Sequence, residues 1–203
     1  MTEKSKHIIH TQKLLNTHIL KRIKEVCFQK TDMDIKTISE WLIENWMIDL
    51  TFDQDIISGY LKDWSNIEGH AIGLCRPKNN FESSILIHVL NELKIPFTIS
   101  AGKTNLTGSA TPNGGFVLST EKLNRSKPVV KNNYVSCSPS SLLEDMRLEV
   151  LSQTKNRMYY PVDPTSRREA TIGGTISCNA SGFVPGRKGA TRYWVRSLDI
   201  ILP

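Results

Sequence analysis

The 203-residue sequence predicts an α+β fold of two small lobes, preceded by a helical N-terminal extension. Three observations lead to this prediction. Apolar residues recur at helical spacing over residues 8–50, and short apolar runs broken by Gly, Pro and Asn follow residue 65. A further amphipathic segment then leads into a long loop-rich stretch. With 39% hydrophobic and 23% charged residues, the chain has the composition of an ordinary globular protein.

Residues 1–68 contain two amphipathic patterns. Over residues 8–27 the apolar residues alternate with basic ones at helical spacing, which predicts one helix. Residues 35–50 place Trp41 and Trp46 on one side of a second helix, where packing is the simpler explanation for both tryptophans. We expect these helices to form the extension and a domain boundary to fall near Gly69.

Residues 69–125 predict the first lobe, a small α/β unit that alternates strands with one helix. The predicted elements are strands at 71–75, 96–100 and 116–119, and a helix that ends before Pro96. Asn79 followed three residues later by Glu82 is typical of a helix start with reciprocal capping.

Residues 126–203 predict a second, mixed lobe. A strand at 134–137 precedes Ser141 and Glu144, whose spacing predicts another capping box and an amphipathic helix. The chain closes on an apolar strand at 197–203. Between these elements, residues 159–182 resemble no packed element, and a long loop of this kind is often functional.

The overall charge leaves several classes of partner open. Lys and Arg exceed Asp and Glu by 26 to 20, which favours anionic partners without choosing among them. The four cysteines have no CxxC spacing and the five histidines have no metal-ligand spacing, so we expect buried thiols and no metal site. Without an apolar signal core at the N-terminus or a stretch of ~18 apolar residues, a cytoplasmic protein with no transmembrane segment is expected.

A local basic cluster near the C-terminus offers a nucleic-acid alternative. The cluster comprises Arg187, Lys188, Arg192 and Arg196, and it adjoins Tyr193 and Trp194. Phosphate contacts and base stacking use these residue types. A solvated face accounts for the same residues more simply, and no nucleic-acid partner is expected.

The first segment that predicts chemistry is the loop at 100–108, directly after a predicted strand. Its small residues allow backbone amides to surround an anion, and Lys103 adds a positive charge. The tripeptide at 102–104 also matches the end of a Walker loop, but that motif requires a glycine where Phe97 stands. A pyrophosphate site or a solvated turn therefore remain the two interpretations of this loop alone.

The second segment is the loop at 159–182, rich in proline, glycine and small hydroxyl residues. Two prolines fix an extended path. Gly173 and Gly174 remove side chains where a flat ligand or another backbone approaches. Thr171, Ser177 and Asn179 offer hydrogen bonds to a polar ligand.

Together and in this order, these segments resemble the FAD-binding domain of the vanillyl-alcohol oxidase and p-cresol methylhydroxylase (PCMH-type) superfamily, especially its D-lactate dehydrogenase and glycolate oxidase branch. The resemblance covers about residues 53–203. The matching motifs lie at 60–64, 101–108, 112–115, 118–119, 160–164, 171–174, 179–182, 189–192 and 198–203. Each motif alone is weak, whereas the ordered set is specific.

The resemblance implies FAD as the cofactor and two α/β lobes with the flavin between them. It assigns the pyrophosphate to the loop residues Ala101, Gly102, Lys103, Thr104, Asn105, Leu106 and Gly108. It assigns the ribityl and isoalloxazine path to Pro161, Asp163, Ser166, Thr171, Gly173 and Gly174. Asn179, Gly182, Gly189 and Ile200 would complete the pocket.

Departures from the family pattern refine these expectations. Ala101, Lys103, Asn105 and Ser181 stand where glycines are common, which predicts altered loop geometry rather than lost binding. The pyrophosphate loop contains no histidine to tether the flavin, so noncovalent FAD is expected.

The sequence ends at Pro203, before the substrate-binding cap domain of the family. We therefore expect an incomplete enzyme whose catalytic residues lie outside this chain.

The resemblance implies an FAD-dependent oxidoreductase that oxidises a small 2-hydroxy acid such as D-lactate or glycolate, with an electron acceptor that the sequence does not identify. The alternatives are another flavoenzyme of the superfamily, such as an aromatic-alcohol oxidase or a cell-wall precursor reductase, and a non-catalytic module that binds FAD or nucleic acid.

Overall fold

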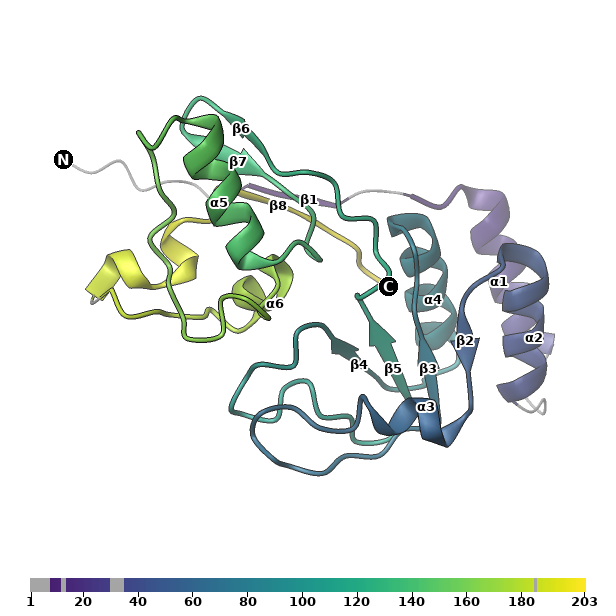
Figure 1. Ribbon diagram of the computed structural model, residues 1–203. Coiled ribbons are helices and arrows are strands. Elements are labelled where there is room, and N and C mark those ends of the chain that lie inside the picture. The colour runs from purple at the N-terminus through teal and green to yellow at the C-terminus, as the bar shows by residue number, and fades with distance from the viewer. Residues whose placement is uncertain (1–7, 12–13, 30–34, 185) are drawn as a thin grey trace. The chain divides into compact units, whose positions relative to one another are not determined.

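The computed structural model describes residues 8–11, 14–29, 35–184 and 186–203, which form a mixed α/β fold (Figure 1). The chain divides into two compact units. Unit 1 contains Ala101–Thr104, Asn124–Asp199 and the described part of Met1–His10. Unit 2 contains Ile200–Pro203, Asn105–Leu123 and the described part of Thr11–Ser100.

Unit 2 is built on a four-stranded sheet in the order β2 (Leu50–Thr51), β3 (Gly73–Cys75), β5 (Phe116–Ser119) and β4 (Phe97–Ser100). β5 pairs in parallel with both β3 and β4, and β2 pairs antiparallel with β3. A Cβ at Gly73 would lie 2.3 Å from the ring of Phe116, so this pairing requires glycine at 73. The three strands predicted for the first lobe are confirmed.

Four helices accompany this sheet: α1 (Thr17–Gln29), α2 (Ile35–Trp46), α3 (Gln54–Ser58) and α4 (Asn80–Glu92). Buried residues of α1, α2 and α4, among them Ile23, Leu42 and Leu86, share one core with Phe116 and Leu118 of the sheet. The reciprocal cap predicted for α4 is present with a shift of one residue. Asn79 Oδ1 accepts from the Glu82 amide, and Glu82 reaches back to the amide of Lys78.

Both N-terminal helices are shorter than the sequence predicted. The segment Ile8–Thr11 is a strand, β1, and α1 follows Asn16, whose side-chain oxygen accepts from the Ile19 amide. α2 ends at Trp46 because Met47 adopts a left-handed conformation with φ of 52°. Apolar spacing alone did not reveal these two end signals.

The described residues before Gly69 pack with those that follow it, because α1 and α2 share their core with α4. The two compact units therefore divide the chain at other places than Gly69. The domain limits 1–68, 69–125 and 126–203 stay predictions.

Unit 1 contains the hairpin of β6 (Val129–Lys131) and β7 (Tyr134–Ser136), and the pair of β1 with β8 (Ser197–Ile200). Its helices are α5 (Leu143–Gln153) and α6 (Ile172–Ser177), followed by the 3-10 turns η1 (Gly186–Gly189) and η2 (Thr191–Tyr193). Leu143, Met146 and Val150 of α5 pack against Ala170 and Ile172 to form the core of this unit.

Two expectations for unit 1 were wrong. The capping box of Ser141 and Glu144 does not form, because the carbonyls of Ala170 and Arg167 take the first amides of α5. The side chain of Glu144 instead pairs with arginines. The loop at 159–182 contains a packed element, α6, whose N-terminal amide at Gly174 is capped by the Thr171 hydroxyl.

The cysteine expectation needs one correction. Cys27 and Cys75 are buried and Cys137 is partly buried, but Cys178 is exposed at the end of α6. In the part of the chain that the structure describes, no helix is long and apolar enough to cross a membrane.

The cap of α4 yields a stability prediction. Asn79→Ala removes the acceptor for the Glu82 amide, and loss of such a cap costs about 1 kcal/mol. Urea unfolding of the full chain should show this loss of free energy. The neighbouring exposed Asn80→Ala serves as the control and should leave the unfolding free energy within ~0.5 kcal/mol. Equal effects of the two substitutions would contradict the capping assignment.

Candidate functional site

The two segments singled out in the sequence meet within unit 1. A Cβ at Gly102 would lie 2.3 Å from the carbonyl oxygen of Glu169 and 3.3 Å from the Cα of Ala170. A Cβ at Gly174 would lie 3.9 Å from the Cβ of Ala101. Residues 101–104 therefore lie directly against residues 169–174, and glycine at 102 is what permits this backbone contact.

The loop after β4 presents backbone donors that the protein itself does not use. Within the described residues, no acceptor bonds to the amides of Gly102, Thr104, Asn105 and Leu106. Lys103 adopts a left-handed conformation with φ of 54°, which turns the direction of the backbone within this run. Neighbouring amides that point to one side of such a turn are typical of an anion site.

The next part of the loop, in unit 2, is held by the side chain of Asn105. Its Oδ1 accepts hydrogen bonds from the amides of Thr107 and Ser109, at 3.1 and 3.0 Å. Gly108 has φ of +75°, which a residue with a side chain rarely adopts. The Asn105 side chain is therefore engaged within the protein, and Leu106, which is 73% exposed, makes little packing contact.

Thr171, Gly173 and Gly174 form the first turn of α6. The Thr171 hydroxyl accepts from the Gly174 amide at 3.2 Å, so it is committed to helix capping. The Gly173 amide donates to the Pro139 carbonyl at 2.7 Å, and a Cβ at Gly173 would lie 2.9 Å from Pro139 Cβ. Gly173 thus accommodates another part of the protein, which was one of the two interpretations that the sequence left open.

Asp163 lies in a network of ion pairs. Its Oδ1 accepts from Arg167 at 2.7 Å and from Arg147 at 2.9 Å, and both arginines also pair with Glu144. The hydrogen bond from Arg167, with the charges of both arginines, lowers the pKa of the Asp163 carboxyl. This carboxylate therefore stabilises unit 1, and the Asp163 carbonyl, beside the buried Pro161, accepts from the Phe183 amide at 3.1 Å.

The remaining predicted residues hold the backbone of their own units. A Cβ at Gly182 would lie 2.3 Å from the Asp163 amide nitrogen, and one at Gly189 would lie 1.8 Å from the Val184 carbonyl oxygen. Asn179, with φ of 46°, accepts from the Arg192 amide. Ser166 is buried in the turn before α6, and Ile200 ends β8.

The loop fits a pyrophosphate on chemical grounds. Four amides without an internal acceptor match an anion with several oxygens, and Lys103 supplies a cation in the same run. Directly before the loop, the hydroxyl of Ser100 is buried without a hydrogen-bond partner among the described atoms. The donor set thus agrees with the phosphate part of FAD.

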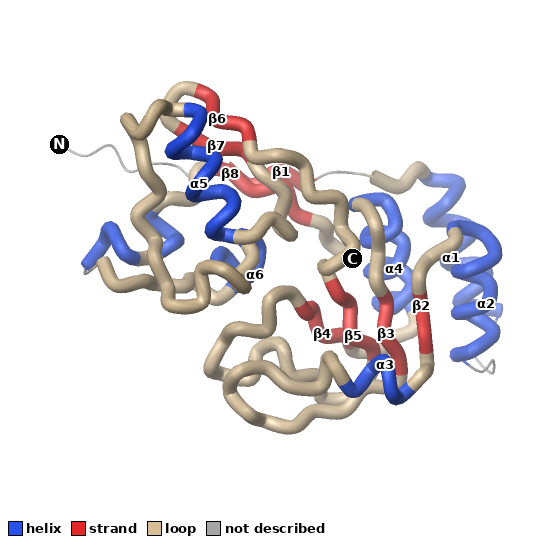
Figure 2. The backbone as a smooth tube through the Cα atoms, viewed as in Figure 1, coloured by secondary structure: helices blue, strands red, loops and turns tan. Residues whose placement is uncertain are grey.

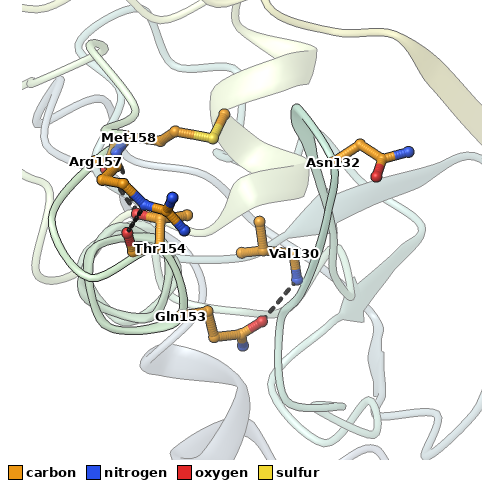
Figure 3. A pocket seen from close by; sticks show the side chains of 6 residues that line it. All are labelled: Val130, Asn132, Gln153, Thr154, Arg157 and Met158. Carbon is orange, nitrogen blue, oxygen red and sulfur yellow. Dashed lines mark hydrogen bonds between the residues drawn. The ribbon is translucent and has the colours of Figure 1, made fainter.

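A hollow lies elsewhere in unit 1, between β6 and the end of α5 (Figure 3). Its volume is about 430 Å³, and none of the predicted FAD residues lines it. Two of its polar side chains are engaged: Gln153 accepts from the Val130 amide, and Arg157 donates to the Thr154 carbonyl. We assign no function to this hollow.

Two arginines of the basic cluster near the C-terminus make intramolecular contacts. Arg192 lies over the ring of Tyr193 at 4.7 Å, and Arg196 lies over the ring of Tyr134 at 4.9 Å. The indole of Trp194 donates to the Lys188 carbonyl. These contacts occupy ring faces that base stacking would need. They agree with the interpretation of the cluster as a solvated face.

Two structural parts of the site were not singled out from the sequence. The turn at 138–141 supports Gly173 through the Pro139 carbonyl. The sequence signal for this turn was the presence of serines on both sides of a proline. Asp63, far from the loop in sequence, accepts from the Ala110 amide just after it. The spacing of Asp63 to Ser65 is typical of an Asx turn, which is a local signal. This signal does not indicate that Ala110 is the second partner of Asp63.

Comparison with known proteins identifies the family of the chain. Residues 71–203 match the family model described as "FAD binding domain". The chain is 32% identical over 150 residues to D-lactate dehydrogenase of Anaerostipes hadrus. This alignment covers 70% of this chain and 31% of that protein. It is 31% identical over 128 residues to glycolate oxidase subunit GlcD of Bacillus subtilis, covering 62% and 27%.

A third relative is D-2-hydroxyglutarate dehydrogenase of Stutzerimonas stutzeri, 29% identical over 155 residues, covering 73% of this chain and 32% of that protein. Among solved structures, p-cresol methylhydroxylase aligns with a TM-score of 0.55 at 17% identity, covering 83% of this chain and 31% of that one. Alkyldihydroxyacetonephosphate synthase gives 0.58 at 15%, covering 70% and 29%. The chain thus spans about a third of the length of these relatives.

The ion pairs of Asp163 predict a pH dependence of stability. Because the pKa of Asp163 is lowered from 3.8 in the folded state, the stabilisation is complete well above pH 3.8 and is lost as pH falls through the lowered pKa of the folded state. Asp163→Asn should make the unfolding free energy less dependent on pH below about pH 5. Denaturant unfolding at several pH values measures this, with the exposed Asp145→Asn as control. An unchanged pH dependence in Asp163→Asn would contradict the assignment.

Proposed function

Because the chain belongs to the FAD binding domain family and takes FAD as its cofactor, we propose that it is the FAD-binding part of an enzyme that oxidises a small 2-hydroxy acid. Three relatives support this substrate class, since they are named for D-lactate, glycolate and D-2-hydroxyglutarate. All three are about three times longer than the aligned part of this chain. The activity of the whole protein is therefore part of the proposal.

The single observation that supports the cofactor site best is a set of four amides, those of Gly102, Thr104, Asn105 and Leu106, that have no acceptor among the described residues. Gly102 packs this stretch against residues 169–170. In the proposal these amides bind the FAD pyrophosphate and Lys103 adds its charge. The segments that begin with Pro161 and with Thr171 supply backbone and shape to the rest of the dinucleotide. Thr171, Asp163 and Asn179 act through the backbone that they order, since their side chains bond within the protein.

We also propose that FAD is held noncovalently, because no histidine occurs in the loop at 100–108. When bound, FAD accepts a hydride in this class of reaction. The residues of this chain bind the dinucleotide and orient it. No residue of the chain is assigned as a proton acceptor for the substrate.

Two alternative functions differ in what they predict. Another flavoenzyme of the superfamily would bind FAD in the same way and act on an aromatic alcohol or a cell-wall precursor. A module without catalysis would bind FAD and support no turnover with any partner. The basic cluster is the support for a nucleic-acid function, and two of its arginines, Arg192 and Arg196, stack on the chain's own rings.

Titration of FAD with the full chain, followed by flavin fluorescence anisotropy, tests the proposal. We expect binding in the micromolar range, and no bleaching of the bound flavin when D-lactate, glycolate or D-2-hydroxyglutarate is added without oxygen, because the chain spans a third of its relatives. No change in anisotropy at about 100 µM protein would contradict the cofactor assignment. Bleaching by a 2-hydroxy acid would show that these residues suffice for chemistry.

Leu106 allows one backbone donor to be removed with a matched control. Leu106→Pro deletes the amide hydrogen at 106, whereas Leu106→Ala keeps it, and the side chain is 73% exposed in either case. A lost hydrogen bond to a charged group corresponds to roughly tenfold to hundredfold weaker FAD binding for the proline variant. The alanine variant should bind within about twofold of the wild type. Equal affinities, with equal circular dichroism spectra, would show that the 106 amide does not contact FAD.

A further inference from the structure

A buried carboxylate lies beneath the loop at 105–110. Asp63 is 5% exposed. It lies beside this loop although it comes 42 residues before Asn105 in the sequence. Its Oδ2 accepts from the Ala110 amide at 3.2 Å, and its Oδ1 accepts from the Ser65 amide at 2.9 Å. Burying a carboxylate away from water costs free energy, and these specific hydrogen bonds offset that cost.

The side chain of Asn105 joins this carboxylate to the loop. Asn105 Oδ1 accepts from the amides of Thr107 and Ser109, which leaves its Nδ2 as the group that donates to Asp63. One carboxylate thereby fixes three amides, that of Ala110 directly and those of Thr107 and Ser109 through Asn105. The amides of Asn105 and Leu106, proposed to bind pyrophosphate, lie on either side of the residue that this link holds.

The same two stretches of chain also touch further along. The His70 amide donates to the Pro112 carbonyl at 3.0 Å, and the Gly114 amide donates to the His70 carbonyl at 2.8 Å. A Cβ at Gly69 would lie 2.3 Å from the Pro112 carbonyl oxygen. Residues 60–72 and 105–115 therefore run side by side, as the adjacent tan loops of unit 2 in Figure 2 show.

The protonation of Asp63 agrees with this arrangement. Burial alone would raise the pKa of its carboxyl, but hydrogen bonds from Ser65, Ala110 and Asn105 outweigh burial and lower it. The group is therefore an anion at neutral pH that only accepts hydrogen bonds. All its partners are donors, and none of them is a cation.

We propose that Asp63 is a positioning residue for the cofactor loop: through Asn105 and Ala110 it holds the loop in the form that binds the FAD pyrophosphate. The inference rests on the proposed function, because it assigns to Asp63 an effect on FAD affinity without contact to FAD. A loop ordered before binding loses less conformational entropy when the cofactor binds, so the effect should be on affinity.

Three variants test the link between Asp63 and Asn105. In Asp63→Asn an amide NH₂ replaces an acceptor and faces a donor, and in Asn105→Asp two carboxylates face each other. Either change should weaken FAD binding roughly tenfold to hundredfold. The double variant D63N/N105D restores one donor and one acceptor at the contact and should recover most of the affinity. Asp55→Asn, at an exposed position of the same unit, is the control and should bind FAD like the wild type.

Amide hydrogen exchange in the free protein gives a second readout that does not depend on FAD. The amides of Thr107, Ser109 and Ala110 should exchange at least about tenfold faster in Asp63→Asn, whereas those of α4 should keep their wild-type rates. The double variant should regain slow exchange. This local pattern separates positioning of the loop from a general loss of stability, which would speed exchange in α4 as well.

The outcomes separate the inference from the proposed function. If the wild type binds no FAD, the proposed function fails, and exchange still decides whether Asp63 orders the loop. If the wild type binds FAD and Asp63→Asn binds equally well, the inference is overturned, whatever the exchange rates show. Failure of the double variant to recover in both measurements would overturn the route through Asn105.

Discussion

The contact of Gly102 with the backbone of Glu169 and Ala170 is the constraint on which the rest of the candidate site depends. It needs a residue without a Cβ, since that atom would lie 2.3 Å from a carbonyl oxygen. The contact fixes where the loop at 101–104 runs in unit 1, and so fixes where its amides are available. A pyrophosphate site made from backbone depends on such placement, because its donors cannot rotate as side chains do.

Glycines and polar side chains have different roles in the candidate site. Gly102, Gly173, Gly182 and Gly189 each permit another backbone segment to approach, and their spacing gives the site its shape. Thr171, Asn105, Asn179 and Asp163 bond to nearby groups of the protein and keep that shape. The donors left for a ligand are mainly backbone amides. This division assigns binding of the anion to the backbone and leaves Asn105 as the loop side chain that keeps the shape of the loop.

Much of the fold could be predicted because its signals are local. Asn79 and Glu82 marked the start of α4, and the strands at 97–100 and 116–119 followed from short apolar runs. Family membership and the cofactor also followed from ordered motifs. The errors had two causes. Distant carbonyls, those of Arg167 and Ala170, accept from the first amides of α5 in place of the local side chain of Ser141. A local cap that apolar spacing does not reveal, Asn16, moves the start of α1 beyond Thr11.

The candidate site could be located from the sequence but not resolved into roles. Nothing near Asp63 in the sequence indicates that Ala110 is its partner, because the pairing exists only once residues 60–72 lie beside residues 105–115. Likewise, a glycine that serves a ligand and one that serves another strand of backbone look the same in a sequence. Which of these two roles a glycine has is therefore read from the structure, as the contacts of Gly102 and Gly173 show.

The most direct test is amide hydrogen exchange of the full chain with and without FAD, read at Gly102, Thr104, Asn105 and Leu106. These amides have no acceptor among the described residues, so they should exchange fast in the free protein and become protected when FAD is added. Protection of these four amides would support the pyrophosphate site. FAD binding that leaves them unprotected, or that protects amides elsewhere in the chain instead, would contradict it.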